Sequence, residues 1–173
     1  LESPANVGMS FLTAATSIGR IKFGTPTANN RGVIAYRHAD DAFTFATTAD
    51  GASSPTERLR ITGIGSVGIN EDQPKALLHV ATDNGQTLPE ISASFPLIVT
   101  KNSNSGIAII AKNDAKSILA FGDTDDADRG KIQYVHTSGD DADSMQFITA
   151  GGTRWKFDSS GHFLPGTASA VNI

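Results

Sequence analysis

The chain of 173 residues contains no cysteine and has few basic residues. Without cysteine there can be no disulfides, no cysteine nucleophile and no cysteine-ligated metal site. Lys and Arg number 14 against 18 Asp and Glu, which gives a net charge of −4 with the four His residues neutral. Nucleic-acid binding usually depends on a clustered basic face. The charge balance therefore argues against nucleic acid as a partner.

Long apolar runs and helical periodicity are also missing. No apolar run approaches the ~20 residues that span a membrane, so we expect no membrane insertion. No stretch repeats apolar residues at helical spacing between two capping residues. The sequence has no nucleophile elbow, P-loop, zinc-protease helix or dinucleotide-binding glycine motif. We therefore predict no catalytic residues, no cofactor and no metal site.

What the sequence does contain is a series of short segments in which apolar and polar residues alternate. In GRIKFG, for example, Ile21 and Phe23 have polar neighbours. Turns rich in Gly, Pro, Asn and Asp separate these segments. The others include RGVIAYRH, DAFTFAT, ERLRIT, GSVGIN, DSMQFITA, TRWKFD and GHFLPG. Strands this short, recurring about every 8–12 residues, predict an all-β fold of antiparallel meanders or sandwich units.

One pattern occurs twice. Phe-Gly, a polar loop, Arg-Gly and Tyr-x-His run through residues 23–38 and again through residues 121–136, an offset of 98 (121 − 23). After small length changes at turns, the correspondence continues and aligns Leu59 with Trp155. Loops tolerate such length changes at little cost in free energy. We therefore predict two tandem β units.

The predicted units are a first β unit at residues 1–70, a connector with strands at 71–102, and a second β unit with the C-terminal end at 103–173. Each repeat is only roughly 60 residues long, and a sheet of that size is marginal by itself. The whole chain has nine Phe, two Tyr and one Trp. Because these residues build only a small core, we expect each copy to bury apolar surface against other copies.

The segment ERLRITGIGSVGINEDQPKALLHV, Glu57–Val80, resembles one common in tail fibres and tailspikes of tailed bacteriophages. There an E-R-M-R-I strand, a turn ending in Gly, a V-G-I-G strand and an L-H-V strand follow one another. Residues 20–47 resemble the strands that usually precede it, and Thr153–Ile173 is similar to the C-terminal end of such fibres. This chain departs from the pattern at the turn Ile64–Ser66, and its second repeat lacks the L-H-V strand.

The resemblance implies an intertwined homotrimeric fibre, extracellular and in the virion tail, that binds polysaccharide or lipopolysaccharide of the host surface. In many relatives a self-cleaving intramolecular chaperone follows, and this chain stops near the position of that cut. Its start suggests a fragment of a longer chain. Two alternatives stay open. The chain is a stalk or spacer without a ligand, or a glycan depolymerase component whose acids, such as Asp126 and Asp141, act across a subunit groove.

Two loops and one strand supply the candidate ligand-binding residues. The acidic run Asp123–Gly130 could hold Ca²⁺, but the spacing of an EF-hand is absent and the equivalent residues 25–32 contain no acid. A solvated acidic turn is the interpretation that we favour. Trp155 could stack against a sugar, although it aligns with the core position Leu59. The full set is Asp125, Asp126, Asp128, Asp140, Asp141, Arg154 and Trp155, with Thr25–Asn30 and Ser138–Ser144 as further contact loops.

Two further patterns recur in both units. Tyr and His alternate at residues 36 and 38 and at 134 and 136, so each pair should share one face of its strand. We interpret them as structural pairs, with an ion held by three copies of His136 as the alternative. Arg31 and Arg129 each precede Gly, and we expect both to form internal bridges.

Overall fold

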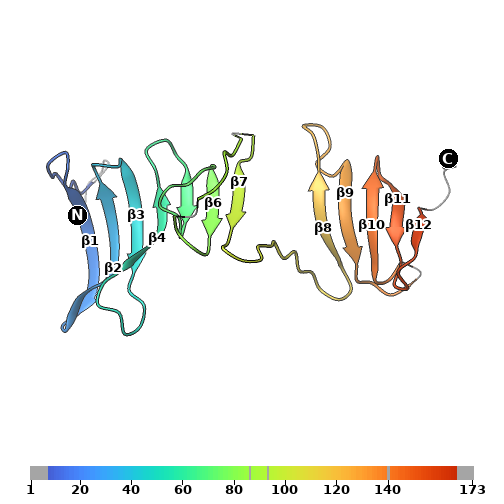
Figure 1. Cartoon of the computed structure of the whole chain (residues 1–173), viewed down its shortest axis with the longest axis horizontal. Helices are drawn as coiled ribbons and strands as arrows, with labels where there is room; N and C mark the ends of the chain where they lie inside the picture. The colour runs from blue at the N-terminus through green and yellow to red at the C-terminus, as the bar shows by residue number, and fades with distance from the viewer. Residues whose placement is uncertain (1–7, 86, 93, 140, 167–173) are drawn as a thin grey trace, which may run out of the picture. The chain divides into compact units, whose positions relative to one another are not determined.

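The structure, a computed structural model, describes residues 8–85, 87–92, 94–139 and 141–166 (Figure 1). The all-β prediction is confirmed, since these residues form twelve strands in two mostly antiparallel sheets and no helix. They accordingly include no helix that could cross a membrane. The chain divides into two compact units, Leu1–Gly106 and Ile107–Ile173, and each contains one sheet.

The first sheet has seven strands that neighbour one another in chain order. They are β1 (Ile18–Thr25), β2 (Ala28–Arg37), β3 (Ala42–Thr47), β4 (Thr56–Ile61), β5 (Val67–Ile69), β6 (Leu78–Ala81) and β7 (Leu97–Thr100). Strands β1 to β5 pair antiparallel, whereas β5–β6 and β6–β7 are parallel pairs. The predicted connector 71–102 thus contributes β6 and β7 to the first sheet.

The second sheet is an antiparallel meander of five strands. They are β8 (Lys116–Phe121), β9 (Gly130–Val135), β10 (Ser144–Thr149), β11 (Gly152–Phe157) and β12 (Phe163–Pro165). The turns that join β8 to β9 and β9 to β10 lie at opposite ends of this sheet, because successive antiparallel strands reverse direction.

The polar loop predicted at Thr25–Asn30 is wrong in its extent. Strand β1 continues to Thr25 and β2 begins at Ala28, so the turn is only two residues long. Residues of the expected loop belong to strands because ladder hydrogen bonds do not require apolar side chains, so the hydrophobic pattern ends before the strand does. Gly24 fits here because a Cβ would approach the Asn29 Cα to 2.5 Å.

The four antiparallel strands that start each unit have the same register. In the first sheet Ile21, Ile34, Phe45 and Leu59 pair in a row across β1 to β4. In the second sheet the corresponding row across β8 to β11 is Leu119, Ile132, Phe147 and Trp155. Positions in the two sheets can therefore be compared one by one.

A β-bulge occurs at the same place in both sheets, in β4 opposite Phe45 of β3 and in β11 opposite Phe147 of β10. An arginine lies at each bulge. The Nε of Arg58 donates to the Thr47 hydroxyl at 3.4 Å, and the Nε of Arg154 donates to the Thr149 hydroxyl at 3.1 Å. Because a bulge adds one residue to a strand, it changes which residues beyond it share a face.

No Phe, Tyr or Trp side chain is buried among the described residues of either unit. Side chains alternate between the two faces of a sheet. In the described residues, the buried apolar side chains are all small or aliphatic: Ala35, Ala42, Ala81, Val135 and Ile148. His79, on β6, is fully buried, and its Nε2 lies 3.0 Å from the Thr100 hydroxyl. Each unit is therefore a single open sheet rather than a sandwich with a core of its own.

Candidate functional site

The first sheet presents one face of large apolar side chains to solvent. This face, called apolar face 1, carries eight large side chains that are between 36% and 54% exposed. They are Ile21, Phe23, Phe43, Phe45, Ile61, Ile69, Leu78 and Leu97. A contiguous exposed apolar surface of this kind marks an interaction site.

The second sheet has the same property. Its apolar face 2 carries five large side chains that are between 37% and 55% exposed: Leu119, Phe121, Phe147, Phe157 and Phe163. Trp155 belongs to this face and is half-buried. Its ring stacks on Phe163, with centroids 4.6 Å apart and planes inclined by 13°. Trp155 therefore has apolar neighbours, but it lies half-buried on an open sheet face and not in a buried core of its unit, which its alignment with Leu59 had suggested.

The side chain of Arg154, next to Trp155, forms hydrogen bonds within its own hairpin. Besides the bond to the Thr149 hydroxyl, its guanidinium donates to the Thr149 carbonyl oxygen at 3.1 Å. The side chain is exposed, but its hydrogen bonds hold the bulge and the turn that follows β10. Arg154 and Trp155 therefore have different surroundings although they are neighbours in sequence.

The acidic turn uses its carboxylates to hold its own backbone. One Asp123 carboxylate oxygen accepts hydrogen bonds from the backbone N–H groups of Asp125 and Asp126, both at 3.0 Å. Asp126 accepts from the Asp128 N–H at 3.1 Å. The hydrogen bond from Lys131 lowers the pKa of Asp128. Among the described residues no three acids or histidines cluster as ligands of a metal ion. This geometry is that of a solvated acidic turn.

Asp141 lies at the other end of the second sheet, where Lys156 donates to its carboxylate at 2.7 Å. That hydrogen bond lowers the pKa of Asp141. Lys156 pairs with Gln146, one position beyond Trp155, so its side chain lies on the face opposite to Trp155. Asp140 lies outside the described residues.

The candidates that the structure describes therefore do not converge within one chain. Strands of six residues place the turn at Asp126 and the turn at Asp141 roughly 20 Å apart. Trp155 is on apolar face 2, away from both. A glycosidase needs its two carboxyl groups within about 10 Å of each other. Within the second unit of one chain, Asp126 and Asp141 do not meet this requirement.

The Tyr-His pairs lie as the alternation predicted. The rings of Tyr36 and His38 have centroids 4.9 Å apart, and those of Tyr134 and His136 are 4.8 Å apart. His136 Nε2 lies 3.0 Å from the Ser117 hydroxyl. These contacts give the pairs a structural role within each unit.

The predicted arginine bridges are realised for only one of the two residues. Arg129 lies 3.7 Å from the Asp123 carboxylate, and both side chains are more than half exposed. Among the described residues Arg31 has no ion-pair partner. The Arg129 pair therefore contributes little, because solvent screens such contacts to within about 1 kcal/mol.

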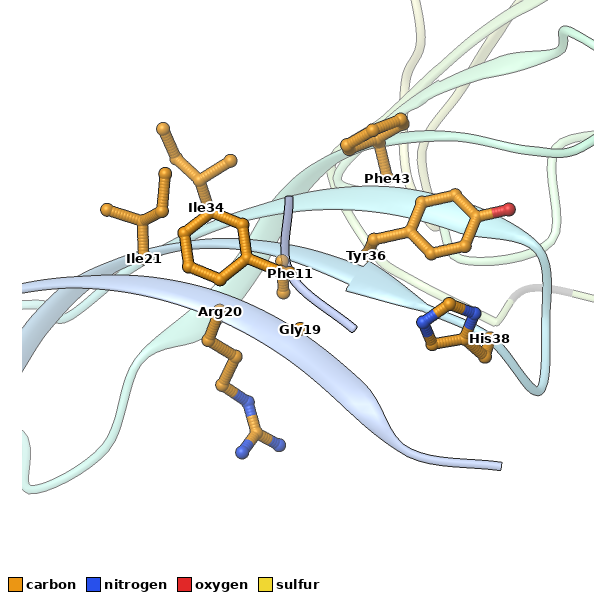
Figure 2. A pocket seen from close by; sticks show the side chains of 9 residues that line it. Phe11, Gly19, Arg20, Ile21, Ile34, Tyr36, His38 and Phe43 are labelled. Carbon is orange, nitrogen blue, oxygen red and sulfur yellow. The ribbon is translucent and has the colours of Figure 1, made fainter. Parts of the chain in front are cut away.

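A pocket on apolar face 1 was not foreseen from the sequence (Figure 2). It has a volume of about 330 Å³ and is lined mainly by Phe11, Ile21, Ile34, Tyr36 and Phe43. Phe11 precedes the first strand, and its Cβ lies 3.6 Å from the position of a Cβ on Gly19. The alternating strand pattern gave no signal for it, because Phe11 lies outside that pattern. Such a lining suits an apolar side chain.

Comparison with protein-family models and with curated proteins found no match. Function is therefore inferred from the geometry and from the sequence. The geometry offers two exposed apolar faces, two polar faces and a set of exposed turns.

Proposed function

We propose that this chain is a β-structured segment of a homotrimeric bacteriophage tail fibre or tailspike that attaches the virion to glycans on the bacterial surface. The observation that supports the proposal is the exposure of apolar faces 1 and 2. Exposing so many large apolar side chains to water is unfavourable, because each Å² of apolar surface left in water costs about 25 cal/mol of free energy. Each unit needs a cover that the unit itself does not provide.

Other copies of the same chain are the cover that symmetry allows most simply. Three copies can turn the same face toward a common axis, which closes the assembly and leaves no free apolar face. Such an assembly also brings sheet edges together, and the edges of an open sheet otherwise pair with unrelated chains. Both units of each chain would take part, since both have an apolar face.

An attachment role follows from the surfaces that such a trimer would leave exposed to solvent. Its polar faces and turns, including those near residues 25–30, 123–128 and 138–144, would meet the bacterial surface. Each contact with a sugar is weak, but three linked copies gain avidity without any new contact. Attachment of the virion to the bacterial surface would therefore depend on assembly of the trimer.

A spacer within the fibre is the second candidate function. It is favoured by the internal use of Arg154, Asp128 and Asp141, which leaves few of the candidate side chains for a ligand. A spacer would assemble in the same way and would bind no cells.

The test is the binding of fluorescently labelled, assembled protein to a panel of bacterial cells, with purified lipopolysaccharide as competitor. Attachment predicts saturable binding that the lipopolysaccharide displaces and no release of reducing sugar ends. Release of reducing ends would favour the depolymerase. An assembled trimer that binds no strain of the panel would favour the spacer. Antibodies against the chain should label virion tails, and absence of labelling would contradict both fibre roles.

A further inference from the structure

The polar face of the first sheet contains a hollow of about 410 Å³, here called the basic groove. Its floor is formed by small side chains of β2 and β3: Val33, Ala35, Thr44 and Ala46. Its rims are formed by the long side chains of Arg20 and Lys22 on β1 and of Glu57 on β4. The hollow exists because small side chains on two central strands lie between long ones on the flanking strands.

Arg20 and Lys22 are the charged groups that the groove leaves uncompensated. They are two residues apart on one strand and therefore share its polar face. Figure 2 shows the Arg20 side chain directed away from Ile21, which belongs to apolar face 1. Neither Arg20 nor Lys22 has an ion-pair partner among the residues that the structure describes. Their positive charges stand out in a chain whose net charge is −4.

The other charged side chains that line the groove, Arg37 and Glu57, have ion-pair partners. Arg37 donates to Asp40 at 2.7 Å. Arg60 donates to both carboxylate oxygens of Glu57, at 2.8 and 3.2 Å. The bulge in β4 makes this second pair possible, because it brings residues three apart onto one face. The positive charge that remains for a ligand is therefore that of Arg20 and Lys22.

The second sheet shows that the fold does not require such a groove. The shared register places Ile118 where the first sheet has Arg20, and Ala120 where it has Lys22. The floor positions of Ala35 and Thr44 correspond to Gln133 and Gln146. These two glutamines are each 4% exposed, and Gln133 donates to Gln146 at 2.9 Å. The same positions are thus filled and uncharged in one sheet, hollow and cationic in the other.

We propose that the basic groove binds an anionic sugar, a carboxylated or phosphorylated residue of a surface glycan. Arg20 and Lys22 would hold the anion by charge-assisted hydrogen bonds, which are about twice as strong as neutral ones. The apolar parts of Val33 and Ala46 would contact the sugar ring. The volume of about 410 Å³ is within the range of small-molecule sites. The choice of a saccharide rests on the proposed attachment function, whereas the choice of an anion rests on the groove alone.

The experiment measures binding to the full chain by isothermal titration calorimetry. The probes are trigalacturonic acid, glucose 6-phosphate and the neutral galactotriose. We expect one of the anionic probes to bind about tenfold or more tightly than the neutral one, and added NaCl to weaken that binding. The trisaccharide and the sugar phosphate separate a carboxylate ligand from a phosphate ligand. Equal affinities for all three probes would overturn the proposal.

Two variants test the two features of the groove separately. Arg20→Gln with Lys22→Gln removes the charges and keeps the hollow. Ala35→Gln with Thr44→Gln keeps the charges and places in the hollow the glutamine pair of the second sheet. Both are expected to lose about tenfold or more in affinity for the anionic probe. The control Arg31→Gln removes one cation from the same sheet outside the groove and should change affinity by less than about twofold.

The proposal fails if the variant without Arg20 and Lys22 binds the anionic probe as the unmodified chain does. Circular dichroism establishes that each variant is folded. If the glutamine pair prevents folding, the charge variant decides alone. Cell binding separates this proposal from the attachment function. If the charge variant binds cells as well as the unmodified chain does, the proposal for the basic groove is overturned and the attachment function stands. If the unmodified chain binds the anionic probe but no cells, the groove is supported and the result counts against attachment.

Discussion

Replacing Phe23 by serine should weaken assembly strongly, because this side chain lies on apolar face 1 and is 54% exposed in a single chain. Fully burying a Phe side chain stabilises by up to about 3 kcal/mol, so covering its exposed half contributes about 1.5 kcal/mol for each copy. A trimer contains three copies and would lose about 4.5 kcal/mol. That loss corresponds to more than about a thousandfold in the association constant. Sedimentation equilibrium over a range of concentrations measures the change.

Lys22→Ser is the matched control, since it alters the neighbouring residue of the same strand on the opposite, polar face. It should leave the association constant within about threefold of its original value. If circular dichroism shows both to be folded, equal association constants for Phe23→Ser and the unmodified chain would contradict this prediction. Apolar face 1 would then not be the surface through which copies meet.

Three further substitutions test the units themselves. Gly68→Ala should destabilise the first unit by about 3 kcal/mol in urea unfolding, because the added Cβ would overlap the carbonyl oxygen of Glu71. Glu57→Gln should cost about 1–2 kcal/mol in the same assay, because Arg60, with 12% of its side chain exposed, loses its charged partner. The pKa of Asp141 is lowered from 3.8, so its stabilisation is complete above about pH 4 and is lost as the pH falls further. Asp141→Asn should therefore reduce the fall in melting temperature between about pH 5 and pH 3.

Each of these three substitutions has a control. Gly106→Ala should leave stability unchanged, since no atom lies within 4 Å of the added Cβ, and a loss equal to that of Gly68→Ala would contradict the steric argument. Adding Arg60→Gln to Glu57→Gln should give less than the sum of the single effects, and strict additivity would argue against coupling. An Asp141→Asn variant whose melting temperature falls with acid as before would show that this carboxylate is not responsible.

The strands could largely be predicted from the sequence because alternation is a local property. Ile21 and Phe23 alternate with polar residues, and they lie on one face of β1. The parallel pairing of β5, β6 and β7 was not predicted, because the pattern of Leu78–Ala81 is the same for a parallel or an antiparallel neighbour. Arg58 and Arg154 occupy equivalent positions at the two bulges, but nothing in their sequence context indicates an extra residue in the ladder.

The surroundings of the candidate residues were harder to predict than the strands. That Trp155 stacks on Phe163 depends on a cross-strand neighbour eight residues away, which a local pattern does not reveal. The basic groove depends on side-chain size at Ala35 and Thr44, on two different strands. Small residues carry no chemical signal by themselves, and only the register shows that they lie beside Arg20.

The native mass of the chain, measured by multi-angle light scattering, shows directly whether three copies assemble. We expect a mass near three times 18.1 kDa, with apolar faces 1 and 2 covered by other copies. A mass near 18.1 kDa over the whole accessible concentration range would contradict it. Both apolar faces would then meet water in a stable monomer, and the main support for a trimeric attachment fibre would be gone.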